Sequence, residues 1–312
     1  MKLSLVVPCY NEAENVALFQ ETVIQAFCEC SYDFELVFVD DGSKDATLHE
    51  LRKLFKEQKC PVKVVSFSRN FGKEAGIYAG LKQTCGEYVA LIDADLQQRP
   101  EIVRDMVQIL DEKPEYDVVA AYQDRRGESK VLSFFKKSFY SLINKLSDIN
   151  LKSDASDFRT FRRSVADSII ALGEYHRFSK GIFAWVGYNT CFIPYVACER
   201  AAGVSKWNFW KLFNYAVDGI IGYSTKPLRI STFLGGLTAF AALAYLVVVI
   251  LQKLITGIDI PGYATIIVLI LFLGGMQLFC IGIIGEYVGR TFEQSKERPI
   301  YVAKEILTYE DQ

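Results

Sequence analysis

The sequence lacks an excess of positive charge. It contains 35 Lys and Arg residues against 37 Asp and Glu residues, a formal net charge of −2 over 312 residues. Proteins that bind nucleic acid through its phosphates carry a basic surplus or a concentrated basic patch. The overall charge balance shows no basic surplus, so no nucleic-acid partner is expected.

The motifs of common zinc and phosphate sites are also missing. None of the eight cysteines forms a CxxC pair, and Cys28 and Cys30 are too close, with no histidine nearby, for a zinc knuckle. We interpret the cysteines as free, mostly buried thiols in a reducing compartment. Neither GxGxxG nor GxxxxGK[ST] occurs at the end of a predicted strand, which argues against those two phosphate-binding loops.

Charge is absent from two long stretches near the C-terminus. Residues 230–252 (ISTFLGGLTAFAALAYLVVVILQ) and 260–285 (IPGYATIIVLILFLGGMQLFCIGIIG) contain no charged residue. Each is longer than the roughly 20 residues that a helix needs to cross a bilayer core. As a helix, the first would be roughly 34 Å long at 1.5 Å per residue. They predict two transmembrane helices; the alternative is a buried helix pair in a large soluble domain.

The flanking charges predict how these helices are oriented. The start of the chain, MKLSLVVPCYNEAE, does not have the pattern of a signal peptide, so residues 1–205 are expected to form a cytosolic domain. Basic residues flank the pair of uncharged runs on the outside: Lys226 and Arg229 before the first, and Arg290, Lys296 and Arg298 after the second. The loop between the runs has only one base, Lys253, and one acid, Asp259. This asymmetry predicts a multi-pass protein of the plasma membrane, with a cytosolic tail over 286–312.

Residues 206–229 join the two parts. This segment mixes aromatic residues such as Trp207 and Trp210 with Lys206, Lys211 and Lys226. Aromatic and basic side chains beside a membrane span are typical of amphipathic helices that lie in the interface. The alternative is a linker packed into the core.

The first 125 residues alternate between strand and helix patterns. Strands are predicted over 3–8, 34–39, 62–67, 88–92 and 117–122. Helices are predicted from Asn11, with Glu14 completing a capping box, after Asp45, over Glu74 to Gln83, and from Pro100. This alternation predicts an α/β domain whose central sheet is mostly parallel and covered on both faces.

Acidic clusters follow three of the predicted strands: PCYNE, DDGSKD and DADLQ. Ligands of open α/β sheets bind beyond the carboxyl ends of the strands. Asp93 and Asp95 point to the same side if Ala94 turns away, and they could hold a divalent metal that a substrate diphosphate completes. The alternative is a solvated turn with two acids.

Six motifs occur in a characteristic order: VVPCYNEAEN, VDDGSKDAT, SRNFGKEAG, DADLQQRPE, SDFRTFRR and RAAGVSKW. With them, nearly the whole chain resembles family 2 glycosyltransferases, in the subgroup that transfers sugars from nucleotide diphosphates to polyprenyl phosphates. This subgroup includes dolichol-phosphate mannose synthase and bactoprenol glucosyltransferase. The resemblance implies a GT-A type nucleotide-sugar-binding domain, followed by the interfacial helices and the two membrane helices.

The motif SRNFGKEAG favours the bactoprenol glucosyltransferase branch. This implies inverting transfer of glucose from UDP-glucose to undecaprenyl phosphate, dependent on Mg²⁺ or Mn²⁺, for modification of a cell-envelope glycan. Other sugars stay open: N-acetylglucosamine, galactose, mannose or a modified pentose. Because two spans are few to shield a long lipid, a homo-oligomer is expected, by resemblance a tetramer.

The resemblance also implies roles for residues on the donor side. Pro8, Tyr10 and Glu12 would line the nucleoside pocket, and Asp40 or Asp41 would contact the base with Arg69 nearby. Asp93 would face the ribose and the metal, and Asp95 would bind the metal with help from Gln97. The family often has Asp and Pro after DADLQ, whereas Gln98 and Arg99 stand here, which puts only the local loop in doubt.

On the acceptor side, the resemblance places Asp157 beside the transferred sugar, as a base or as an orienting acid, and gives Arg159, Arg200 and Lys206 to the lipid phosphate. A phosphate acceptor is already anionic near neutral pH and needs a strong base less than an alcohol does. Asp157 could therefore orient more than deprotonate. The alternative interpretation of Asp157 is a helix cap. The alternative for the nearby arginines, above all Arg163, is that they lie on a solvated face.

Two other function classes compete with this reading. A processive polysaccharide synthase would carry a QxxRW motif and more spans, and the sequence has neither. A non-catalytic membrane scaffold would not need both carboxylates of DAD together with the basic motifs. The sequence therefore favours an enzyme.

Overall fold

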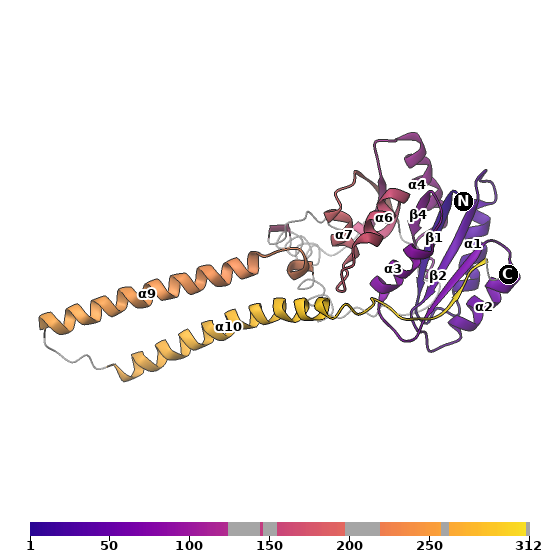
Figure 1. Cartoon of the computed structure of the whole chain (residues 1–312). Coiled ribbons are helices and arrows are strands. Elements are labelled where there is room, and N and C mark those ends of the chain that lie inside the picture. Colours follow the sequence, from indigo (N-terminus) through magenta and orange to yellow (C-terminus); the bar gives the residue numbers. More distant parts are fainter. Residues whose placement is uncertain (124–143, 146–154, 197–218, 257–261, 310–312) are drawn as a thin grey trace.

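An α/β domain and a helical hairpin that projects from it make up the molecule (Figure 1). The computed structural model describes residues 1–123, 144–145, 155–196, 219–256 and 262–309. The predicted interfacial segment 206–229 falls mostly outside the described residues, which resume at Gly219.

The central sheet has eight strands in the order β7-β5-β6-β4-β1-β2-β3-β8. Their bounds are β1 Leu3–Cys9, β2 Phe34–Asp40, β3 Val62–Phe67, β4 Tyr88–Leu91, β5 Val118–Gln123, β6 Ala155–Arg162, β7 Thr190–Tyr195 and β8 Ala303–Leu307. Strands β6 and β8 run antiparallel to their neighbours, and the other pairings are parallel. The predicted mostly parallel sheet is confirmed, and all five predicted strands are present.

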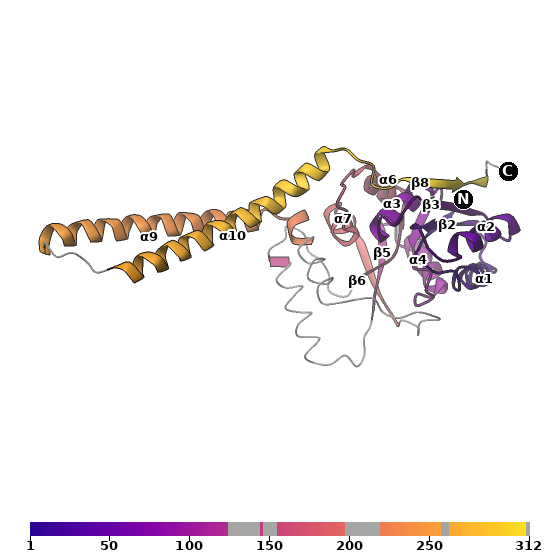
Figure 2. The ribbon, with the colours of Figure 1, turned by 90° about the horizontal axis from the view of Figure 1, so that it is seen from below.

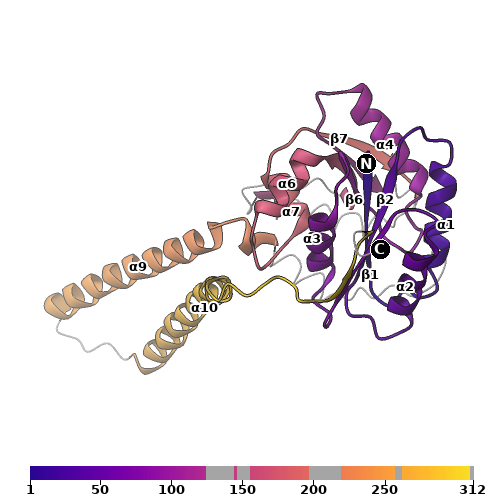
Figure 3. The same ribbon diagram turned by 45° about the vertical axis from the view of Figure 1, so that its right-hand side comes forward.

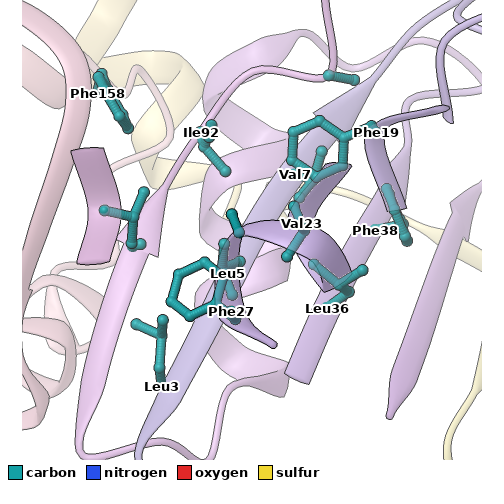
Figure 4. Close-up of a cluster of buried hydrophobic side chains, with 14 of the residues drawn as sticks. Leu3, Leu5, Val7, Phe19, Val23, Phe27, Leu36, Phe38, Ile92 and Phe158 are labelled. Carbon is teal, nitrogen blue, oxygen red and sulfur yellow. The ribbon is translucent and has the colours of Figure 1, made fainter. Parts of the chain in front are cut away.

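Helices cover both faces of this sheet, as predicted. Their bounds are α1 Val16–Phe27, α2 Thr47–Glu57, α3 Lys73–Gln83, α4 Pro100–Glu112, α6 Arg163–Ala171 and α7 Ser179–Trp185. On one face, β1 side chains Leu3, Leu5 and Val7 pack with Phe19 and Val23 of α1 (Figure 4). The opposite face packs against α3, α6 and α7. Alternation along β1 produces this division, because successive strand side chains point to opposite faces.

The predicted start of the first helix is wrong. Helix α1 begins at Val16, and Asn11 instead adopts a left-handed backbone with φ of 57°. The Asn11 side-chain oxygen accepts a hydrogen bond from the backbone N–H of Lys44 at 2.9 Å, and its own N–H donates to Ser43 Oγ at 2.9 Å. Asn11 therefore ties the loop after β1 to the loop after β2, a long-range partnership that outweighs the local capping pattern.

The hairpin consists of α9, Lys226–Thr256, and α10, Tyr263–Ser295. Helix α9 covers the first uncharged run, and α10 covers the second from Tyr263 onward. The two helices lie side by side (Figures 1 and 2). Both are long and apolar enough to cross a membrane, and their apolar side chains are largely exposed in the isolated chain. Exposed apolar surface of this extent marks an interaction site rather than a soluble exterior.

After α10 the chain returns to the α/β domain. The yellow C-terminal segment runs back to the α/β domain in Figure 3, and strand β8 pairs antiparallel with β3 at the edge of the sheet (Figure 2). Tyr301 stacks on Phe67 with ring centroids 4.9 Å apart, and Arg52 forms an ion pair with Glu305 at 2.6 Å. The predicted cytosolic tail, 286–312, therefore begins within α10, which ends at Ser295, and contributes strand β8, Ala303–Leu307, to the sheet. Strand β8 covers an edge of β3 that would otherwise expose unpaired backbone.

The expectation of mostly buried cysteines is wrong for the described part of the chain. Cys9 is buried, whereas Cys28 and Cys85 are exposed. The other free cysteines described, Cys30, Cys60, Cys191 and Cys280, are half-buried. Composition cannot predict which thiols end up in loops and at helix ends.

Candidate active site

The carboxyl ends of β4, β1 and β2 meet at one edge of the sheet, because these strands are adjacent and parallel. The acidic clusters of the sequence are therefore neighbours in space. Antiparallel β6 completes this edge: Leu91 at the end of β4 pairs with Arg159 of β6, and Asp157 comes two residues before Arg159 at this edge. The Lys73 ammonium contacts both Asp93 and Asp157, so the two carboxylates are close together. A strand entering from the opposite direction thus adds a third carboxylate to the pair in DAD.

The DAD turn has an internal brace that the sequence did not predict. Gln98 is 6% exposed; its Oε1 accepts a hydrogen bond from the Asp93 N–H at 3.0 Å, and its Nε2 donates to Asp93 Oδ2 at 3.2 Å. Asp95 Oδ1 accepts a hydrogen bond from the Gln97 N–H at 3.2 Å. The departure from the family pattern at Gln98 therefore supports Asp93.

Lys73, at the start of α3, links two of the carboxylates. Its Nζ lies 2.6 Å from Asp93 Oδ1 and 3.6 Å from Asp157 Oδ2. Burial opposes the charge on Lys73, but the two carboxylates outweigh it and raise the pKa of Lys73 above its usual value. Sequence reasoning assigned no role to Lys73; its place in SRNFGKEAG was the only signal.

Asp157 lies in β6, so its alternative interpretation as a helix cap is wrong. Burial raises the pKa of Asp157, but Lys73, Lys180 and Arg159 outweigh burial and hold the pKa below its usual value. Asp157 is therefore ionised at neutral pH. Its Oδ1 is buried and has no hydrogen-bond partner within the described part of the chain. Such an atom is costly unless a ligand or water satisfies it.

Arg159 is buried beside this aspartate. Its Nη2 donates a hydrogen bond to the Ser156 carbonyl at 2.8 Å, and its guanidinium lies 4.0 Å from the centre of the Phe183 ring. The solvated-face interpretation is wrong for Arg159 and also for Arg163, which donates to the Gly86 carbonyl at 2.6 Å. Arg163 joins α6 to the base of β4 and is structural.

Glu74 was also missed by the sequence analysis. Its Oε2 accepts hydrogen bonds from the Ser179 N–H at 2.9 Å and from the Ser179 hydroxyl, joining α3 to α7. Burial and the charge of Asp157 raise the pKa of Glu74 to about 7, against the lowering effect of the Ser179 bonds. Through its hydrogen bonds to Ser179, Glu74 fixes the position of the first residue of α7 against α3.

Asp40 and Asp41 are engaged inside the domain. Asp40 accepts hydrogen bonds from the Ser43 N–H and from Ser66 Oγ, at 3.0 and 2.9 Å. Asp41 accepts from the backbone N–H groups of Phe71 and Gly72, at 2.6 and 2.9 Å. Asp41 thus holds the loop that leads into Lys73. Contact of either aspartate with a nucleotide base stays a prediction.

Gly42 allows the two loops to approach each other. Its φ is 63°, and a Cβ at this position would lie 2.4 Å from the Arg69 carbonyl carbon. Arg69 itself lies over the Phe71 ring, with its guanidinium 4.2 Å from the ring centre. The glycine of DDGS is thus required by backbone contact, since no side chain fits there.

The remaining predicted nucleoside-pocket residues lie at the end of β1 and just after it, at the same edge of the sheet. Pro8 is within β1, Tyr10 comes directly after it, and both are partly exposed. Glu12 accepts a hydrogen bond from Asn15 Nδ2 at 2.6 Å, and its N–H donates to Thr47 Oγ1 at 2.9 Å. The predicted lipid-phosphate residues Arg200 and Lys206 lie outside the described residues.

Comparison with known proteins decides the class of this site. Residues 4–170, more than half of the chain, match the family described as Glycosyl transferase family 2. The chain belongs to glycosyl transferase family 2. Residues 226–291 of this glycosyltransferase match the GtrB C-terminal hairpin, which covers most of α9 and α10. The expected enzyme class and GT-A type fold are confirmed.

Relatives extend over the whole length of this glycosyltransferase. It is 41% identical over 305 residues to the bactoprenol glucosyl transferase of Shigella phage SfV, covering 97% of this chain and 98% of the relative. It is 40% identical over 306 residues to the prophage bactoprenol glucosyl transferase homolog of Escherichia coli strain K12, covering 98% and 99%. The predicted resemblance to that branch is confirmed.

Solved structures are more distant. Mannosyl-3-phosphoglycerate synthase from Rubrobacter xylanophilus matches with a TM-score of 0.49 and 15% identity, covering 70% of this chain and 71% of that one. Glucosyl-3-phosphoglycerate synthase from Mycobacterium tuberculosis, in complex with Mn²⁺ and UDP-glucose, matches with a TM-score of 0.45 and 20% identity, covering 70% and 77%. At these values the likeness carries no conclusion about ligand or metal.

The donor set of the glycosyltransferase fits a divalent cation that substrate completes. Asp93 and Asp95 offer partly exposed carboxylate oxygens, the ligands that Mg²⁺ and Mn²⁺ prefer. Within the described residues, no group of three or more His, Cys, Asp and Glu side chains could hold a metal alone. The residues therefore suit an open site that diphosphate oxygens complete.

Proposed function

We propose that this glycosyltransferase transfers a glucosyl group from UDP-glucose to a polyprenyl phosphate, with undecaprenyl phosphate the expected acceptor, for modification of a cell-envelope glycan. The observation that carries the proposal is similarity over 97–98% of the chain, hairpin included, to proteins named for bactoprenol glucosyl transfer. The geometry of the site supports the proposal. The DAD turn at the end of β4 suits a diphosphate bound together with a divalent metal, and the ionised Asp157 lies nearby.

The proposed metal is Mg²⁺ or Mn²⁺, held by Asp93 and Asp95 with Gln97 beside them. When bound, it would neutralise the negative charge that develops on the departing diphosphate. Gln98 would keep Asp93 oriented toward this site through the two hydrogen bonds described above. Asp41 and Gly42 would hold the facing loop in place.

The proposed reaction inverts the sugar carbon. An acceptor phosphate oxygen would attack C1 of the sugar from the face opposite the diphosphate; the C1–O bond to UDP breaks as the new C1–O bond forms, and UDP leaves with the electron pair. Asp157 is ionised and lies beside the Lys73 ammonium that also contacts Asp93, so it would orient the acceptor and could take a proton from a monoanionic phosphate.

The experiment that tests this function supplies the purified full chain, in detergent, with radiolabelled UDP-glucose, undecaprenyl phosphate and Mg²⁺. Chloroform-soluble label is the expected product. Parallel reactions use UDP-N-acetylglucosamine, UDP-galactose, GDP-mannose and a nucleotide-linked modified pentose. A soluble polymer would indicate a polysaccharide synthase, and no product with any donor would favour a scaffold.

We also propose that both membrane helices span the plasma membrane, with the catalytic domain and both termini on the cytoplasmic side. Strand β8 supports this arrangement, because its pairing with β3 requires the C-terminal segment to lie on the same side as the catalytic domain. The exposed apolar side chains of α9 and α10 would face lipid or other copies. The expected homo-oligomer stays a prediction.

A tag placed after Gln312 is expected to be labelled only from the cytoplasmic side. The physical reason is the β8–β3 pairing together with the bases outside the two spans. A tag in the 257–261 connection serves as the matched control and should be labelled from the opposite side. Labelling of the C-terminal tag from outside intact cells would contradict the two-span arrangement.

A further inference from the structure

Lys180 is a basic residue of the site with no ionic partner. It is the second residue of α7, and the groups that influence its charge are Asp157, Arg159, Lys73 and Glu74. No hydrogen bond or ion pair involves its ammonium within the described ranges of the chain. Burial lowers the pKa of Lys180, and Asp157 only partly offsets this. A half-buried ammonium in such surroundings lacks an anion.

The other two cations near Asp157 already have partners. Lys73 pairs with Asp93 as well as with Asp157. Arg159 donates to the Ser156 carbonyl and lies against the Phe183 ring. Of the three cations that act on Asp157, Lys180 is thus the one whose ammonium makes no ion pair or hydrogen bond in the described structure.

The position of Lys180 on α7 relates its ammonium to the hairpin. Its neighbour Ser179 is anchored to Glu74 on α3. Its other neighbour, Gly181, packs so closely on Tyr223 that a Cβ there would lie 2.3 Å from Tyr223 Cε2. Tyr223 comes three residues before α9. Lys180 is therefore held between the Asp157 cluster and the base of the apolar hairpin, where the headgroup of a membrane lipid would enter.

We propose that Lys180 binds the phosphate of the lipid acceptor beside Asp157. This inference rests on the proposed function and adds to it a residue that recognises the acceptor. The donor diphosphate is the less suitable ligand, because Lys180 follows Tyr175 and His176, which contact Gln294 and Glu293 of α10, whereas the DAD turn is at the end of β4. Glu74 and Gly181 are positioning residues, which fix the start of α7 against α3 and Tyr223.

The test compares Lys180→Gln and Lys180→Arg with wild type in the full chain. Loss of one charge-assisted contact should raise the KM for undecaprenyl phosphate by about 10- to 100-fold. Donor affinity, measured by calorimetry with UDP-glucose and Mg²⁺, should stay within about twofold, and Lys180→Arg should recover most of the acceptor affinity. Lys82→Gln, on the exposed side of α3 over the Tyr78 ring, is the matched control and should change neither quantity.

Different failures have different meanings. Transfer by wild type to no polyprenyl phosphate would overturn the proposed function itself. Active wild type with an unchanged acceptor KM in Lys180→Gln would overturn only the role of Lys180, as would a loss of donor affinity in a stably folded variant. If Lys180→Gln does not fold, Lys180→Met replaces it, since Met keeps the apolar stem that packs beside the site. The same KM criterion then decides.

Discussion

Replacing Asp157 with asparagine is expected to lower turnover by about 10²–10⁴-fold if the carboxylate takes part in proton transfer. Asp157 is ionised and shares the Lys73 ammonium with Asp93, while one of its oxygens is buried without a partner in the described structure. Asparagine keeps the size of the side chain but removes the charge. Donor affinity should stay nearly unchanged, because the metal and diphosphate are assigned to the other side of the site.

The measurement combines single-turnover transfer with calorimetric titration of UDP-glucose. Asp105→Asn is the matched control, since Asp105 is exposed on α4 and its replacement should leave both quantities unchanged. A loss smaller than tenfold would assign Asp157 an orienting role only. Unchanged transfer would contradict any direct role for Asp157 in the reaction.

Replacing Asp95 with asparagine is expected to weaken both donor binding and turnover, the latter by about 10²-fold or more, because the diphosphate loses a metal worth several kcal/mol. Asp95 is partly exposed at the end of the DAD turn, and its Oδ1 accepts a bond from Gln97. The wild-type enzyme in EDTA should fall to a similar level, and added Mg²⁺ or Mn²⁺ should restore the wild type but not the variant.

The metal dependence of donor binding separates the two aspartates. Titration of UDP-glucose with and without Mg²⁺ should show a large metal effect in wild type and in Asp157→Asn, and a small one in Asp95→Asn. Full wild-type activity in EDTA would overturn the metal assignment of Asp93 and Asp95. Equal loss of donor affinity in Asp95→Asn and Asp157→Asn would refute the division between a donor side and an acceptor side.

Much of this protein could be predicted from local sequence patterns. Two runs of more than 20 uncharged residues can hardly form anything except apolar helices, and they correspond to α9 and α10. Short apolar runs, which alternate along the chain with helical patterns, predicted the strands β1 to β5. The DAD motif predicted a polar turn at the end of β4. These features depend on the period of hydrophobicity along a short stretch, which the sequence displays directly.

The arrangement of the site depended on contacts between distant segments. Strand β6 inserts antiparallel between β4 and β5, and this pairing brings Asp157 to the same lysine as Asp93. The segment that carries Asp157 has polar and aromatic residues in a pattern that fits a helix cap as well as a strand. Its conformation was decided by the vacant edge of β4, which no local pattern reveals.

The same limitation explains the other unpredicted residues. Lys73 is adjacent to Asp93 because Asp41 holds the preceding loop, and Gln98 braces Asp93 because the DAD turn folds back on itself. The C-terminal segment joins β3 as β8 after more than 230 intervening residues. The sequence by itself determined which segments are strands, which helices are apolar enough for a membrane, and which family motifs are present. Tertiary structure alone decided which charges face each other, because ion pairs and strand pairings join residues whose separation along the chain carries no periodic signal.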